Sequence, residues 1–151
     1  MLKTISAVPT LQVVGAYVAG DNMGGLLTYS IGTSSVASKA ASCTIRRIVI
    51  IDADIEDAEV LLHVFSDTPT ATVTTDADPC APAAADLLLK LATIHVAAAD
   101  YMDSTGDSIV TNELDIPINF DGEDLYCSLE CVGTPTYTAA DDLIVTLVVE
   151  V

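Results

Sequence analysis

The chain has 151 residues, of which 51% are apolar, and it carries 22 Asp and Glu residues against 5 Lys and Arg, for a formal net charge of −17. This length is typical of a single domain that buries enough surface to fold without a disulfide or a metal. The apolar residues come in bursts shorter than a membrane span, and the charge repels phosphate backbones and anionic lipid, so we expect a soluble domain that binds neither nucleic acid nor a membrane.

The N-terminal stretch "MLKTISAVPTLQVVGAYVAG" does not contain the continuous apolar core of a signal peptide, because Ser6, Pro9 and Thr10 interrupt it. We expect residues 1–8 to form a mobile arm or the lead into a first strand. Residues 9–151 are then the single domain.

Eight segments combine β-branched residues with boundaries of Gly, Pro, Asp or Asn, which is the pattern of short β-strands. In chain order they are residues 10–18, 25–31, 43–52, 58–66, 92–98, 113–120, 124–132 and 142–151. One short helical turn is expected within residues 81–91, "APAAADLLLKL". The pattern predicts an all-β fold, a single antiparallel β-sandwich that is jelly-roll-like.

The last of these segments, "DLIVTLVVEV", alternates clearly. The residues expected to face the core are Leu143, Val145, Leu147, Val149 and Val151. The opposite face still carries Ile144 and Val148. We expect these two residues to be covered by another subunit of a homotrimer or by the N-terminal arm.

Two of the four cysteines stand four residues apart in one expected strand. Alternation places Cys127 and Cys131 on one face, roughly 13 Å apart, whereas a disulfide needs Cα atoms within about 7 Å. Two thiolates at that separation cannot share one zinc ion. We therefore expect Cys127 and Cys131 to be buried structural thiols, and the pairing of Cys43 or Cys80 with another cysteine stays open.

The remaining polar residues predict no metal site. His63 and His95 lie inside expected strands and could meet if those strands were neighbours, but no third ligand is in view. The run "DADIED" at 52–57 lacks the sixth-position glycine and twelfth-position glutamate of an EF-hand loop. The acidic runs at 76–80, 103–107 and 121–124 are either irregular oxygen sites for a cation or solvated turns.

Neither catalytic nor basic clusters emerge from the sequence. There is no G-x-S-x-G or H-E-x-x-H motif, and "GDNMGG" at 20–25 lacks the lysine of a phosphate-binding loop. Strand alternation places Arg46 and Arg47 on opposite faces, so we expect no basic patch. We expect a protein that is not an enzyme and has no cofactor.

Four segments together resemble small virion structural proteins of tailed bacteriophages. They are "AYVAGDNMGGLLT", "IRRIVIIDADIEDAEVLLHVFSDTPT", "AADLLLKLATIHVAAADYMD" and "LYCSLECVGTPTYTAADDLIVTLVV", which span roughly residues 16 to 149. The cysteines and the histidine in "LLHVFSD" depart from that pattern.

The resemblance implies a head decoration, or cement, protein on the exterior of the capsid. Such a protein would bind the major capsid protein, commonly as a trimer with a jelly-roll-like sandwich, and would carry no catalytic residues. We expect its shell contacts to come from turns and the N-terminal arm. The alternative is a carbohydrate- or receptor-binding β-sandwich module of a phage tail or fibre, which is disfavoured because the chain has no Trp and few other aromatic residues.

Overall fold

The computed structural model describes residues 1–32, 40–70 and 73–151. Within these ranges the chain forms nine strands, one short α-helix and a 3₁₀ turn. The strands are β1 (Leu2–Ala7), β2 (Asn22–Ser30), β3 (Ala40–Asp52), β4 (Val60–Phe65), β5 (Lys90–Val96), β6 (Met102–Asp103), β7 (Ser108–Asp121), β8 (Asp124–Cys131) and β9 (Leu143–Glu150). The helix α1 is Ala84–Leu89, inside the expected segment, and the 3₁₀ turn η2 is Ala98–Asp100.

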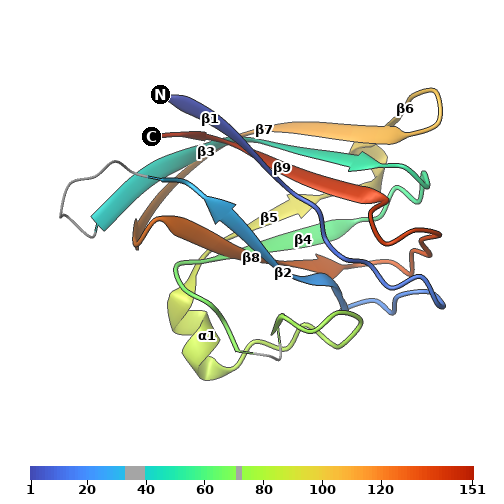
Figure 1. Cartoon of the computed structure of the whole chain (residues 1–151), viewed down its shortest axis with the longest axis horizontal. Coiled ribbons are helices and arrows are strands. Elements are labelled where there is room, and N and C mark those ends of the chain that lie inside the picture. The colour runs from blue at the N-terminus through green and yellow to red at the C-terminus, as the bar shows by residue number, and fades with distance from the viewer. Residues whose placement is uncertain (33–39, 71–72) are drawn as a thin grey trace.

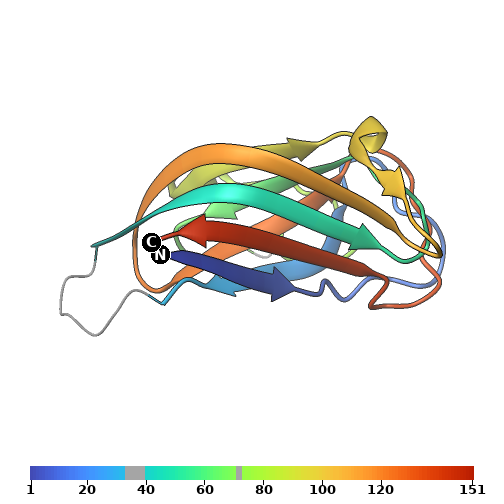
Figure 2. The ribbon, with the colours of Figure 1, turned by 90° about the horizontal axis from the view of Figure 1, so that it is seen from above.

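The strands form two antiparallel sheets that pack face to face (Figures 1 and 2). The first sheet has the order β1-β9-β3-β7-β6, and the second has the order β2-β8-β4-β5. Hydrogen-bonded pairs join β1 to β9, β2 to β8, β3 to β7 and β4 to β5, so one long antiparallel ribbon is folded over on itself. This is the double Greek key of a jelly roll, and the predicted all-β sandwich is confirmed.

The core lies between the two sheets and follows the period-two alternation of their strands. On β9, Leu143, Val145, Leu147 and Val149 are fully buried, as the sequence predicts. They belong to one cluster with the inward residues of β3, β4 and β8. Burial of each such side chain contributes about 1.5–3 kcal/mol, so this cluster provides most of the stability of the sandwich.

Part of the outer face of the second sheet is covered by the chain itself. The connection from β4 to α1 passes over this face, on the side away from the first sheet (Figure 1). It buries Phe65 and Val73, which are outside the main core. Asn22 anchors the connection, because its side-chain amide donates to the carbonyl oxygen of Val73 at 2.9 Å. Three polar residues of the second sheet, Asn22, His63 and Ser128, are buried.

Residues 1–8, expected to be a mobile arm or the lead into a first strand, include a strand of their own. Residues Leu2–Ala7 are themselves an edge strand, paired with β9 over six register positions. The segment lacks a strand-like apolar pattern, because Lys3 shares the half-buried face with Ile5 and Ala7 while Leu2 is exposed. The segment lies beside β9 in the sheet, so it does not cover the outward faces of Ile144 and Val148.

The expected strand at residues 10–18 is wrong. This segment is a connection whose Leu11 and Tyr17 are buried, while Val14 and Val18 are exposed. Two of its amides bond to loop carbonyl oxygens, since Leu11 donates to Ala140 and Tyr17 donates to Pro135, each at 2.9 Å. Its apolar and β-branched residues give the segment a strand-like composition, but residues 10–18 form no regular ladder with another strand.

The expected opposite orientation of the two arginines is also wrong. Ile45 and Ile48 both face the core, so Arg46 and Arg47 both point outward at a β-bulge, where the register shifts. Arg46 forms ion pairs with Asp115 and Glu150, and Arg47 pairs with Glu113. The arginines are thus neighbours on one face, but acidic side chains neutralise them.

Two features of the whole molecule complete the fold. The termini lie side by side, and the amide of Val151 donates to the carbonyl oxygen of Met1 at 2.9 Å (Figures 1 and 2). In the part of the chain that the structure describes, no helix has the length and apolar character needed to cross a bilayer.

Candidate functional site

The outer face of the second sheet holds a buried histidine next to a glutamate. His63 on β4 and Glu130 on β8 both point away from the main core, because their neighbours Leu62 and Leu129 point into it. The His63 Nε2 and Glu130 Oε2 atoms are 2.6 Å apart. Only 10% of the histidine side chain and 23% of the glutamate side chain are exposed.

The backbone places Cys80 beside this pair. The Cys80 amide donates to Gly20 at 2.7 Å, and Asp21 forms an isolated antiparallel bridge with Pro79. Gly20 donates in turn to Cys131 at the end of β8, at 2.7 Å. Two successive backbone contacts therefore fix the position of the cysteine relative to the strand that carries Glu130.

The three side chains form one compact group, which we call the His-Cys-Glu cluster. The ligand atoms of His63, Cys80 and Glu130 all lie within 4.8 Å of one another. Across residues 1–32, 40–70 and 73–151, no other group of three or more His, Cys, Asp or Glu side chains has this geometry. Imidazole, thiol and carboxylate together are a donor set suited to a transition metal such as zinc.

Neighbouring hydroxyl groups contact two members of the cluster. His63 Nδ1 lies 3.4 Å from the hydroxyl oxygen of Thr93, on the neighbouring strand β5. The Cys80 sulfur lies 3.7 Å from the hydroxyl oxygen of Ser128, which is fully buried. A partner on Nδ1 orients the imidazole ring, as outer hydrogen bonds do for metal-binding histidines.

Burial controls the protonation of the histidine and the cysteine. Burial lowers the pKa of His63, although the contact with Glu130 opposes this effect. Burial also raises the pKa of the Cys80 thiol, while its contact with Ser128 and the positive charge of Lys90 act in the other direction. Both shifts favour the neutral forms of the two side chains.

Sequence spacing could not reveal this cluster. Its members stand 17 and 50 residues apart along the chain and match no metal-binding motif. The sequence predicts no metal site and indicates only that His63 and His95 could meet if their strands were neighbours, which they are. However, His95 Nε2 bonds to Glu59 at 2.7 Å, so the structure gives each histidine its own glutamate.

Two aspartates of the acidic runs, Asp76 and Asp52, have structural roles. Asp76 accepts hydrogen bonds from the Tyr17 hydroxyl at 2.7 Å and from the Gly24 amide at 2.6 Å. Asp52 accepts hydrogen bonds from the amides of Asp54 and Asp57, each at 3.1 Å. Asp76 thus joins two loops, and Asp52 holds the turn that follows β3.

The predicted burial of the two strand thiols is confirmed. Cys127 and Cys131 are fully buried in the main core, and all four cysteines are free. Burial raises the pKa of Cys127, and the Cys131 thiol donates to the carbonyl oxygen of Val18 at 3.0 Å. Both therefore act as apolar core residues, and the question left open for Cys43 and Cys80 resolves as two free thiols.

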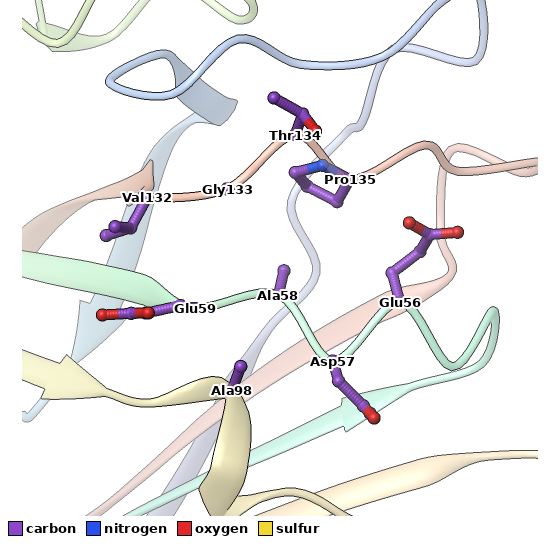
Figure 3. A pocket seen from close by; sticks show the side chains of 9 residues that line it. All are labelled: Glu56, Asp57, Ala58, Glu59, Ala98, Val132, Gly133, Thr134 and Pro135. Atoms are coloured by element: carbon purple, nitrogen blue, oxygen red, sulfur yellow. The ribbon is translucent and has the colours of Figure 1, made fainter.

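An open pocket of about 320 Å³ lies where β4 begins and β8 ends (Figure 3). Its three carboxylates, from Glu56, Asp57 and Glu59, point in different directions rather than toward a common centre. Glu56 accepts a hydrogen bond from Thr136 at 3.0 Å, and Glu59 bonds to His95. The side chains that line the pocket include no aromatic residue, so it offers neither a cation cage nor a stacking platform for a sugar.

The residues expected at an oligomer interface, Ile144 and Val148, lie half-buried on the outer face of the first sheet. Ile144 is directly opposite Ile51, which is opposite Ile109, which is opposite Met102. These four side chains form a cross-strand apolar row. Val148 is instead opposite Arg47 and Thr4, in a polar surrounding.

No protein-family model and no curated protein sequence matches the chain.

Proposed function

We propose that this chain is a non-enzymatic structural protein of a phage virion, a decoration protein that binds the outer surface of the head and stabilises the shell. The observation that carries the proposal is the strand order, which is that of a jelly roll. Jelly rolls are frequent in viral capsid proteins, and the resemblance of the sequence to phage head proteins led us to expect one.

The charge supports an exterior position. A protein with a formal net charge of −17 is repelled by packaged nucleic acid, so the inner surface of a filled head is unfavourable for it. The arginines on the first sheet do not change this, because Asp115, Glu150 and Glu113 pair with them. The partner in this proposal is the major capsid protein.

A homotrimer is part of the proposal. The cross-strand apolar row of Ile144, Ile51, Ile109 and Met102 gives the outer face of the first sheet a continuous apolar strip. Met102 is 67% exposed, so the strip is open to solvent in the isolated chain. In a closed trimer, contact between subunits along this strip would bury one copy of it on each of the three subunits.

Stabilisation of the shell would follow from mass action. A protein that binds the assembled lattice but not the free shell subunits shifts the equilibrium toward the lattice. At a free concentration of 100 times its dissociation constant, it contributes about 2.7 kcal/mol per site.

The test adds the purified chain to phage heads that lack their decoration protein. We expect saturable binding at a fixed ratio to the major capsid protein, together with a higher temperature of shell disruption. Heads that already carry their full decoration are the matched control and should bind no more. Absence of binding to the bare heads, or no change in their disruption temperature, would reject the proposal.

The alternative is a carbohydrate- or receptor-binding module, because jelly rolls also occur in lectins. A glycan array distinguishes the two functions. Saturable binding to one defined sugar, without binding to shells, would establish the alternative instead.

A further inference from the structure

We propose that the His-Cys-Glu cluster binds one zinc ion, or a similar divalent transition metal, through His63 Nε2, the Cys80 sulfur and a Glu130 carboxylate oxygen. The proposal is independent of the role in the virion. It rests on three different ligand types converging within 4.8 Å on a buried part of the second sheet.

The distances suit a tetrahedral ion after a small adjustment. Zinc binds nitrogen and oxygen at about 2.0–2.2 Å and sulfur at about 2.3 Å, which separates tetrahedral ligand atoms by roughly 3.3–3.8 Å. The metal-free contact between His63 and Glu130 is 2.6 Å, and all pairs lie within 4.8 Å. Shifts of about an ångström, well within the range of a side-chain rotation, would bring the three atoms to these distances.

The backbone holds the ligands in advance. His63 and Glu130 come from adjacent central strands of one sheet, and Cys80 is fixed by its hydrogen bond to Gly20 and by the bridge at Pro79. A site on rigid elements requires little ordering when the ion binds, and this favours affinity. Three protein ligands leave the fourth tetrahedral position for a water molecule.

The neighbouring groups allow the protons to move as binding requires. Without the ion, a neutral His63 can donate to the Glu130 carboxylate across the 2.6 Å contact only in the tautomer that carries the proton on Nε2. With the ion, the imidazole carries its proton on Nδ1, where the Thr93 hydroxyl oxygen can accept it. The Cys80 thiol releases its proton to solvent and binds as a thiolate, so the net change is one proton released for each ion bound.

The consequence for the fold is a cross-link. Cys80 belongs to the connection that passes over the outer face of the second sheet, whereas the other two ligands belong to the sheet itself. A bound ion therefore attaches this connection to β4 and β8. Because the ligands come together only in the folded chain, binding also stabilises the fold.

The test uses the full chain without an affinity tag, reduced and treated with a chelator that is then removed. Titration with Co²⁺ should produce thiolate-to-cobalt charge-transfer absorption that saturates at one ion per chain, and Zn²⁺ should abolish it by displacement. Cys80→Ser should abolish the absorption. His63→Gln and Glu130→Gln should each weaken binding by at least about tenfold, since even changes to outer groups around a metal produce losses of that size.

Two matched controls lie outside the cluster. Cys43→Ser removes a thiol from the other sheet, and His95→Gln removes a histidine that also pairs with a glutamate. Both variants should retain the cobalt absorption. Zn²⁺ should raise the melting temperature of the wild type and of His95→Gln by the same amount, and that of Cys80→Ser and His63→Gln by clearly less.

Three results would overturn the proposal. They are the absence of charge-transfer absorption in the reduced wild-type chain, absorption that persists in Cys80→Ser, and an equal loss in His95→Gln. The melting measurement compares each variant with and without Zn²⁺. A variant that is less stable than the wild type can therefore still be tested.

Discussion

At the scale of single residues, Asp52 is a carboxyl group that the fold keeps away from water. It is fully buried at the end of β3. Burial raises the pKa of Asp52 to about 6, although hydrogen bonds from the amides of Asp54 and Asp57 oppose the shift. Because the folded chain binds this proton more tightly than the unfolded chain, ionisation of Asp52 destabilises the fold.

This predicts a gain in stability from Asp52 as the pH falls. The gain begins as the pH drops through about 6 and is complete below the unfolded value of 3.8. A shift of about two pKa units corresponds to at most about 3 kcal/mol. Urea unfolding at several pH values should therefore show the stability of the wild type rising relative to that of Asp52→Asn as the solution is acidified.

The control for this measurement is Asp103→Asn, which removes one negative charge from an exposed side chain. Comparing wild type with each variant at every pH cancels the titration of the other carboxylates. A constant difference between wild type and Asp52→Asn from neutral pH to about pH 4 would contradict the raised pKa of Asp52.

At the scale of elements, β1 is the edge of the first sheet and part of its core. Ile5 and Ala7 pack against the main cluster, and six register positions join the strand to β9. The bulge at Arg46 and Arg47 is a second such feature, because one extra residue turns both side chains to the same face. Neither an edge strand with few apolar residues nor a bulge shows a regular alternation of apolar and polar residues in the sequence.

We predict that deletion of residues 1–7 destabilises the sandwich. The deletion exposes the ladder edge of β9 and removes core contacts, so the melting temperature should fall and the chain should aggregate. Circular dichroism melts with light scattering measure both effects. A mobile arm, by contrast, could be removed with little effect on the melting temperature.

The matched control keeps the ladder and changes only outward side chains of the same strand. Leu2→Ser with Thr4→Ser alters two exposed residues of β1 and should change stability by no more than about 0.5 kcal/mol per site. If the deletion variant melts at the wild-type temperature, the strand contributes nothing and the segment behaves as an arm.

At the scale of the whole molecule, Ile144 and Val148 have different surroundings on the outer face of the first sheet, although the sequence pattern assigns both to the same face. Ile144 lies in the cross-strand apolar row, whereas Val148 is opposite Arg47. An aspartate at 148 would lie next to that arginine and could pair with it. Ile144 is therefore the sharper position at which to test the proposed trimer.

We predict that the wild-type chain is a trimer by light scattering during size exclusion, and that Ile144→Asp is monomeric. The new charge would have to be buried against apolar side chains without a partner, which is strongly unfavourable. Val148→Asp should weaken the trimer less.

Thr28→Asp is the control, because it adds the same charge to an exposed position on the second sheet. It should leave the trimer intact. A monomeric wild type, or a trimer that Ile144→Asp does not affect, would place the apolar row outside any subunit interface.

The sequence by itself determined the fold class and much of the core. Seven of the eight expected strands exist, with boundaries shifted by a few residues, and the thiols of Cys127 and Cys131 are buried as predicted. Alternation is a local property that each strand carries in its own residues, so it can be recognised without knowing the neighbours. The sequence pattern is misleading in two segments. Residues 2–7 form a strand although their apolar pattern is weak, and residues 10–18 form a connection although their composition is typical of a strand.

Only the tertiary structure decided which strands are neighbours and what lies over them. His63, Cys80 and Glu130 meet because β4 pairs with β8 and because a long connection folds back over that pair. In the same way, Ile144 becomes part of an apolar row only through its register with Ile51. Such contacts depend on pairing between residues distant in the chain, and that information is in no single segment of the sequence.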